Sequence, residues 1–208
     1  MNVLLIDDHP MIIEGYISML NQPTYIYHKI TSCEQFFKWI HKGIIPDIAV
    51  VDYNLPPYED QNLHNGVDCA VLIQQYAPHC KKMLITAHDE TLMLYKMYKS
   101  VKLDALIVKA DFTSDMICEI VSKNSEVPFL SAKAKFALQE VKMKETLLSN
   151  INIEILMYLA NGFKVSQMND FLSLSTVAIQ KRLNKMLQDF QVTDYHELIQ
   201  FCKKQRLF

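Results

Sequence analysis

Residues 48–56 read IAVVDYNLP. A run of apolar, mostly β-branched residues ends at Asp52, and Pro56 closes the stretch. Short β-branched runs without polar alternation are typical of strands buried on both faces of a parallel sheet. The stretch therefore predicts a central strand over 48–51, with the carboxylate of Asp52 at its carboxyl end.

Similar runs recur on both sides of this strand and alternate with helical patterns. Strands are expected at 3–6, 48–51, 83–85 and 106–108, with a poorer one at 24–27. Helices are expected at 10–20, 32–41, 66–76, 90–100 and 114–121. Such alternation favours a parallel sheet with helices on both faces. Residues 1–121 are thus predicted to form an α/β domain with a five-stranded, doubly wound parallel sheet.

Polar side chains follow four of these strands. Asp7 and Asp8 follow the first, Asp52 the third, Thr86 the fourth and Lys109 the fifth. Functional side chains gather outside the carboxyl ends of the strands in an open α/β sheet. Three carboxylates brought together repel one another unless they share a cation, and hard oxygen ligands favour Mg²⁺. The sequence therefore predicts an acidic Mg²⁺ pocket with a hydroxyl and an ammonium beside it.

Each of these residues also has an ordinary structural role open to it. The acid pair could cap the helix that begins at Pro10, Asp52 could lie in a turn, Thr86 could be a cap, and Lys109 could be solvated. Their joint occurrence favours a functional site over separate structural roles, because an acid pair, an acid, a hydroxyl and a lysine each directly follow a strand.

From residue 148 onward the strand signal disappears and only helical periodicity remains. One helix is expected to end at Asn161 and Gly162, and three more are expected at 165–172, 176–189 and 195–204. The tight connection at 173–175 is typical of a helix-turn-helix. Residues 148–208 are thus predicted to be a small all-α domain, joined to the first domain by a helical linker over 122–147.

The expected helix 176–189 has two unlike faces. Its apolar stripe runs from Ile179 to Phe190, and the opposite face is basic and polar. A basic face opposite a core face suits insertion into a DNA groove, although a solvated amphipathic helix has the same pattern. We expect the basic residues to contact phosphates or base edges and the glutamines to contact base amides. The candidate DNA-contacting residues are Gln180, Lys181, Arg182, Lys185 and Gln188.

The charge is distributed unevenly along the chain. The net charge of −2 combines −6 in residues 1–121 with +2 in 122–147 and +2 in 148–208. A basic carboxy-terminal part suits a nucleic-acid partner, but so small an excess implies weak binding by one copy. A homodimer that reads two half-sites is therefore expected.

Composition argues against a membrane protein and against a thiolate metal site. No apolar run approaches the roughly 20 residues that span a bilayer, and no signal-peptide pattern opens the chain. The five cysteines are scattered, without a CxxC pair. We therefore expect a cytoplasmic protein with reduced thiols.

The motifs LLIDD (4–8), VVDYNLP (50–56), LITAHD (84–89) and ALIVKAD (105–111) resemble those of receiver domains in two-component signalling. The resemblance covers about residues 1–121 and implies a flavodoxin-like fold and a sensor histidine kinase as partner. It implies the following roles: phosphoryl acceptor, Asp52; Mg²⁺ site, Asp7, Asp8, Asp52 and Asn54; switch and phosphoryl stabilisation, Thr86 and Lys109.

The carboxy-terminal part resembles the LuxR-type helix-turn-helix of the NarL/FixJ class. The matching motifs are LS (148–149), EIL (154–156), LANG (159–162) and LS (174–175). This resemblance implies a response regulator, not itself an enzyme, whose phosphorylation controls DNA binding and transcription. Phosphorylation could act by stabilising a dimer or by unmasking the recognition helix.

The sequence departs from the receiver pattern in three places. Leu106 stands where receivers usually carry an aromatic residue, and Tyr95 or Tyr98 could replace that side chain. Residues 56–65 form an insertion that could gate the site, meet a partner or be a plain surface loop. Asn54 and His88, two residues beyond Asp52 and Thr86, occupy positions where side chains in receivers influence hydrolysis of the phosphoryl group.

Two other classes of function remain as alternatives. Hydrolases of the haloacid-dehalogenase type also combine Asp, Thr or Ser, and Lys with Mg²⁺, but they carry a second Asp two residues after the nucleophile, where this chain has Asn54. The other alternative is an adaptor whose terminal helices bind a protein instead of DNA. Charge reversal at Lys181 and Arg182 would leave the function of such an adaptor intact.

Overall fold

A computed structural model describes residues 1–122, 125, 127–143, 149–190 and 192–204. The chain forms two compact units, Met1–Asp89 with Met97–Lys135, and Glu90–Lys96 with Phe136–Phe208. The expected domain boundary at 147–148 lies outside the described residues.

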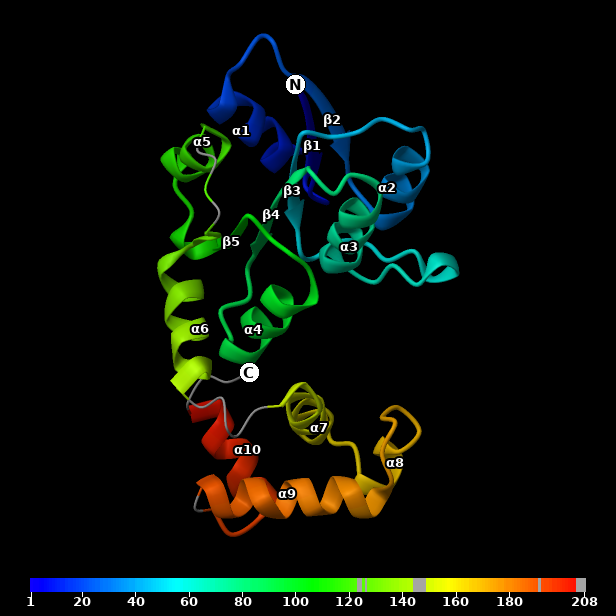
Figure 1. Cartoon of the computed structure of the whole chain (residues 1–208), viewed down its shortest axis with the longest axis vertical. Helices are drawn as coiled ribbons and strands as arrows, with labels where there is room; N and C mark the ends of the chain where they lie inside the picture. The colour runs from blue at the N-terminus through cyan, green and yellow to red at the C-terminus, as the bar shows by residue number, and fades with distance from the viewer. Residues whose placement is uncertain (123–124, 126, 144–148, 191, 205–208) are drawn as a thin grey trace. The chain divides into compact units, whose positions relative to one another are not determined.

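The first unit contains a six-stranded sheet in the order β2-β1-β3-β4-β5-β6 (Figure 1). Every neighbouring pair of strands is parallel, which confirms the predicted α/β fold. All five residues of β3 are buried, as expected for a strand covered on both faces. The strands are β1 (Asn2–Ile6), β2 (Ile26–Ile30), β3 (Ile48–Asp52), β4 (Lys81–Thr86), β5 (Ala105–Val108) and β6 (Phe129–Leu130).

Helices cover both faces of this sheet. On one face, β1 residues Val3 and Leu5 share an apolar core with Tyr16 of α1 and Ile117 of α5. Figure 1 shows α1 and α5 together and α2 beside α3 on the other side, which is the doubly wound arrangement. The helices are α1 (Pro10–Leu20), α2 (Cys33–Ile40), α3 (Gly66–Tyr76), α4 (Thr91–Ser100), α5 (Ser114–Ser122) and α6 (Ala132–Met143).

The sixth strand corrects the predicted count of five. Phe129 and Leu130 lie in the segment expected to be wholly a helical linker, and they pair with the β5 residues Ala105 and Leu106. Ser131 N–H donates to the carbonyl of Leu106 at 3.1 Å. The open backbone groups of a sheet edge can recruit even a two-residue strand, although so short a segment has no pattern of its own.

One further segment differs from expectation, and the structure adds detail to another. β2 spans Ile26–Ile30 instead of 24–27, because only Ile30 in this edge strand is buried and the apolar signal is weak. The insertion 56–65 is ordered: it contains the 3₁₀ helix η1 (Glu59–Gln61), and Tyr58 pairs with Leu63 in an antiparallel bridge. The Tyr58 ring also packs edge-on against Phe37 of α2, with ring centroids 5.8 Å apart.

The carboxy-terminal helices are α7 (Asn150–Ala160), α8 (Val165–Met168), α9 (Thr176–Phe190) and α10 (Tyr195–Lys204). Helix α8 is one turn long and ends before the expected residue 172. None of the helices in the described ranges has the length and hydropathy needed to cross a bilayer. The buried side chains that unite the four helices include Ile153, Leu156, Met168, Ile179, Leu183, Met186, Leu198 and Cys202.

Candidate functional site

The carboxyl ends of β1, β3, β4 and β5 bring the predicted receiver residues together. Asp7 is fully buried and Asp52 is 2% exposed. Lys109 Nζ lies 2.9 Å from Asp52 Oδ1 and 3.4 Å from Asp7 Oδ2. Residues from three different strand ends therefore meet at one charged site, as the sequence predicted for parallel strands.

Burial and charge act against each other at this site. Burial raises the pKa of Asp52, the Lys109 ammonium opposes the rise, and the charges of Asp7 and Asp8 add to it, with a net upward shift. Burial alone lowers the pKa of Lys109, but Asp52 and Asp7 together raise it above its ordinary value. The site thus holds more negative charge than one ammonium offsets.

The donor set fits a hard cation. Asp7, Asp8 and His9 each bring one potential ligand atom within 4.8 Å of the others. Asp8 Oδ1 and Asp52 Oδ1 are buried, and each lies beside one nitrogen: His9 Nδ1 is 2.7 Å from Asp8 Oδ1, and Lys109 Nζ is 2.9 Å from Asp52 Oδ1. Carboxylate oxygens can accept more than one contact and are the ligands that Mg²⁺ prefers. These residues form an acidic cluster of the kind that the sequence predicted for Mg²⁺.

The acid pair does not cap α1. His9 is the N-cap residue, and its side chain makes no capping bond. Its ring instead faces the acids, with Nδ1 2.7 Å from Asp8 Oδ1 and 3.4 Å from Asp7 Oδ1. Asn54, the fourth predicted member of the metal site, has an exposed side chain.

Thr86 ends β4 as a fully buried residue. Its Oγ1 accepts the backbone N–H of His88 at 3.0 Å. The His88 ring stands perpendicular to that of Tyr53, which follows Asp52, with centroids 5.2 Å apart. Leu106, which replaces the usual aromatic residue, is fully buried in β5; its replacement by Tyr95 or Tyr98 stays a prediction.

Two features of the site carried no sequence signal of their own. Tyr16 of α1 is buried, and burial, followed by the charges of Asp7 and Asp52, raises the pKa of its phenol. Gly66 begins α3 so close to β3 that a Cβ atom there would lie 2.0 Å from the Asp52 carbonyl oxygen. Both residues act through partners that are distant in sequence.

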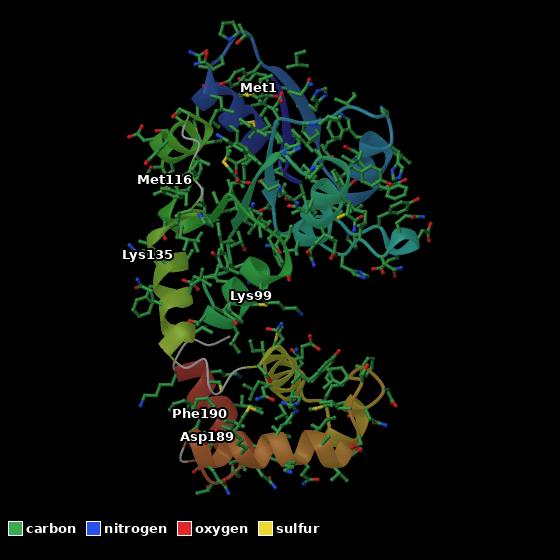
Figure 2. All side chains as sticks on the ribbon, viewed as in Figure 1. Met1, Lys99, Met116, Lys135, Asp189 and Phe190 are labelled. Atoms are coloured by element: carbon green, nitrogen blue, oxygen red, sulfur yellow. The ribbon has the colours of Figure 1, made fainter. Side chains whose placement is uncertain are left out.

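Helix α9 has the two faces that its sequence predicted. Gln180, Lys181, Lys185 and Gln188 are exposed. Asp189 and Phe190 are neighbours at its carboxyl end (Figure 2): Phe190 is buried, and Asp189 Oδ2 lies 3.1 Å from Lys185 Nζ. The basic side chains of this face are therefore accessible, although one of them is paired.

Arg182 differs from the other candidate DNA contacts. Its Nη1 donates to Asn152 Oδ1 at 3.1 Å and to Ser149 Oγ at 3.4 Å, so the guanidinium ties α9 to α7. Val177 at the start of α9 is 78% exposed. The sequence prediction considered only basic and amide side chains on this helix, so it did not identify this exposed apolar residue.

Known proteins resemble both parts of the chain. NreC, the oxygen regulatory protein of Staphylococcus epidermidis, is 21% identical over 223 residues, which cover 100% of this chain and 99% of NreC. RcsB of Salmonella enterica serovar Typhimurium, solved bound to promoter rprA with the phosphomimetic BeF₃⁻, superposes with a TM-score of 0.65 at 17% identity, covering 97% of this chain and 98% of RcsB. Response regulator ChrA of a heme-sensing two-component system gives a TM-score of 0.50 at 22% identity, covering 100% and 98%.

At these identities the structural likenesses establish the fold. The model of the response regulator receiver domain family matches residues 3–122, more than half of the chain. That range contains the acid pair, Asp52, Thr86 and Lys109 in the geometry described above, which confirms the predicted two-component response regulator at the level of the family. The chain belongs to the response regulator receiver domain family.

Proposed function

We propose that the protein is a transcription regulator in which a sensor histidine kinase phosphorylates Asp52 and the phosphorylated receiver controls DNA binding by the carboxy-terminal helices. The observation that carries this proposal is the Lys109 ammonium, held 2.9 Å from Asp52 and 3.4 Å from Asp7. A preorganised ammonium beside a buried acid can stabilise the charge of an added phosphoryl group. The kinase and the DNA would both be met in the cytoplasm.

The chemistry is a transfer between two side chains. A carboxylate oxygen of Asp52 attacks the phosphorus of a phosphohistidine, the phosphorus–nitrogen bond breaks, and the imidazole leaves with a proton from solvent. Lys109 stays against the new acyl phosphate. The Thr86 hydroxyl, which now accepts the His88 N–H, would turn to donate to a phosphoryl oxygen and draw its loop inward.

Asp7, Asp8 and Asp52, with the backbone region of Asn54, would hold Mg²⁺. When bound, the ion supplies positive charge that neutralises the phosphoryl oxygens. The gathering of these carboxylates beside a single ammonium, that of Lys109, supports this assignment.

For DNA binding, we assign the contacts to the exposed face of α9. Lys181 and Lys185 would contact phosphates, and Gln180 and Gln188 base edges. Arg182, held by Asn152, would mainly fix the angle between α9 and α7. Solved complexes of RcsB, including two dimers on two parallel DNAs, support a homodimeric DNA-binding form for a protein of this fold.

The double substitution Lys181→Gln with Lys185→Gln tests the DNA interface. We expect the full-length phosphorylated protein to bind a labelled duplex of mixed sequence roughly tenfold more weakly, because two phosphate contacts per copy are lost. The slope of log affinity against log salt should fall by about 0.9 for each lost contact. Fluorescence anisotropy over a salt series measures both quantities.

The matched control removes the same charge from another helix of the same module. Lys203→Gln with Lys204→Gln changes two exposed lysines at the end of α10. Equal weakening in the two double variants would contradict a specific role for α9. Undiminished DNA binding by the α9 variant would show that another surface contacts the DNA, whereas a lack of DNA binding by the unaltered protein would favour the adaptor alternative.

The start of α6 connects to both loops that flank the phosphorylation site. Lys133 Nζ lies 2.7 Å from Asp89 Oδ2, three residues beyond Thr86. Lys133 N–H donates to Asp111 Oδ2 at 2.7 Å, two residues beyond Lys109. Movement of the Thr86 loop would therefore pull on α6, which precedes the DNA-binding helices along the chain. This route would compensate for the missing aromatic residue at Leu106.

Lys133→Gln should weaken the coupling between phosphorylation and DNA binding without preventing phosphorylation. The measured quantity is the DNA affinity of the phosphorylated protein divided by that of the unphosphorylated protein. A loss of about 1 kcal/mol of coupling free energy would bring this ratio about fivefold closer to one. Lys135→Gln, an exposed lysine on the same helix (Figure 2), is the control and should leave the ratio unchanged. An unaltered ratio in the Lys133 variant would show that the signal leaves the receiver elsewhere.

A further inference from the structure

A second recessed surface lies away from the phosphorylation site, between the edge strand β2 and helix α2. The hollow has a volume of about 480 Å³ and is lined by β2 residues 27–30 and by Gln35, Lys38, Trp39 and Lys42 of α2 and the turn after it. No residue of the phosphorylation site contributes to it. We call this surface the β2–α2 groove.

The backbone of β2 is open on the groove side. β2 is the edge of the sheet and pairs with β1 alone among the described strands. Ile26 N–H donates to Met1 O, and Ile30 O accepts the N–H of Asp7, so these residues turn their backbone groups towards β1. In a parallel ladder the intervening residues, Tyr27 and Lys29, then turn their N–H and C=O groups outward. An added strand would find these donors and acceptors ready to pair.

Trp39 lies in the wall of the groove. Trp39 is only 6% exposed, and its Nε1 has no hydrogen-bond partner among the described residues. A buried indole N–H without an acceptor costs free energy. Because Nε1 itself is buried, the Trp39 ring forms part of the groove wall, and its N–H is not among the groups open to a ligand.

The charge of the groove is positive. Lys29, Lys38 and Lys42 line it, and no acidic residue does. Lys29 pairs with Glu14 and Lys38 with Glu34, but these side chains are half exposed, so the pairs are weak and can exchange partners. Lys42 has no carboxylate partner among the described residues. A second copy of this chain would bring the same lysines to the edge and be repelled.

We propose that the β2–α2 groove binds an extended acidic segment of a partner protein, which adds as a strand to the edge of β2. Its backbone pairs with Tyr27 and Lys29, and acidic side chains at every second position face the groove lysines. A strand has a side-chain period of two, so this spacing keeps the acids on one face. The partner would dock on the receiver without touching Asp52.

The test uses the full chain and an acetylated, amidated peptide of about eight residues, alternating Thr and Glu, a length typical of a strand. Trp39 is the only tryptophan, so its fluorescence reports occupancy of the groove alone. We expect a saturable change with a midpoint below about 1 mM, and slower amide exchange at Tyr27 and Lys29. Lys38→Gln with Lys42→Gln should weaken binding about tenfold, whereas the exposed control Lys102→Gln should not.

Three comparisons can overturn the proposal. A peptide with Lys for Glu should not bind, and one with Pro for Thr should lose binding, because it lacks backbone donors. Equal binding of the Pro peptide, or an equal response to free glutarate, would make the groove a small-anion site and sink the strand assignment. Absence of any saturable response to the Glu peptide would also overturn the proposal. None of these results depends on phosphorylation or DNA binding.

Discussion

The Asp52→Ala variant is expected to take up no phosphoryl group from acetyl phosphate, whereas the unaltered protein takes up one. Asp52 is the acid that Lys109 contacts most closely: the distance from Lys109 Nζ is 2.9 Å to Asp52 and 3.4 Å to Asp7. The variant should fold, because burial raises the pKa of Asp52 and its charge is therefore costly in the folded state. Intact mass after treatment with the phosphodonor counts the adducts directly.

Two controls make this result specific. Asp60→Ala removes an exposed acid from η1 and should keep the full adduct. Chelation of Mg²⁺ should suppress the adduct in the unaltered protein, because the acidic pocket then lacks its counter-charge. An adduct in the Asp52 variant would contradict the assignment of the acceptor. No adduct in unaltered protein that is demonstrably folded would indicate a degenerate receiver, controlled by partners or ligands.

Gly66→Ala is expected to lower the free energy of unfolding of the receiver unit by about 2 to 4 kcal/mol. The added Cβ would lie 2.0 Å from the carbonyl oxygen and 2.9 Å from the carbonyl carbon of Asp52, and both are backbone atoms of a buried strand. Neither atom can swing aside as a side chain could. Either α3 or the end of β3 must move, and the phosphorylation rate should fall with the displacement of Asp52.

Gly15→Ala provides a control of opposite sign. Gly15 lies within α1 and has no neighbouring atom within 4 Å of an added Cβ, so alanine should stabilise the helix by about 0.5 to 1 kcal/mol. Urea unfolding followed by Trp39 fluorescence reports the receiver unit in both variants. If the Gly66→Ala variant had the same free energy of unfolding as the Gly15→Ala variant, the close approach of Gly66 to the Asp52 carbonyl would be contradicted.

The order of the receiver residues could be predicted because the signals are local. Apolar β-branched runs mark buried strands, and in a parallel sheet their carboxyl ends share one edge. These two facts are enough to predict that Asp7, Asp52 and Lys109 lie together. β2 was harder, since an exposed edge strand lacks a continuous apolar run, and its predicted start was wrong by two residues.

The carboxy-terminal helices were also predictable from periodicity, but the roles of their side chains were not. Helical spacing placed Lys181 and Arg182 near one exposed face, as it does for any amphipathic helix. Only the packing of α7 against α9 shows that Arg182 donates to Asn152, 30 positions earlier in the chain. A residue expected to face DNA is thus engaged within the protein.

The sequence by itself determined the parallel α/β sheet, the acidic site at its carboxyl edge and the helical character of the second part. These features rest on side-chain periods of two and 3.6 residues, which act over a few neighbours. Tertiary structure alone decided the pairing of β6 with β5, the ion pair of Lys133 with Asp89 across 44 positions, and the close approach of Gly66 to Asp52. Hydrogen bonds, ion pairs and steric contacts depend on the distance between chain segments in space, and no local pattern encodes that distance.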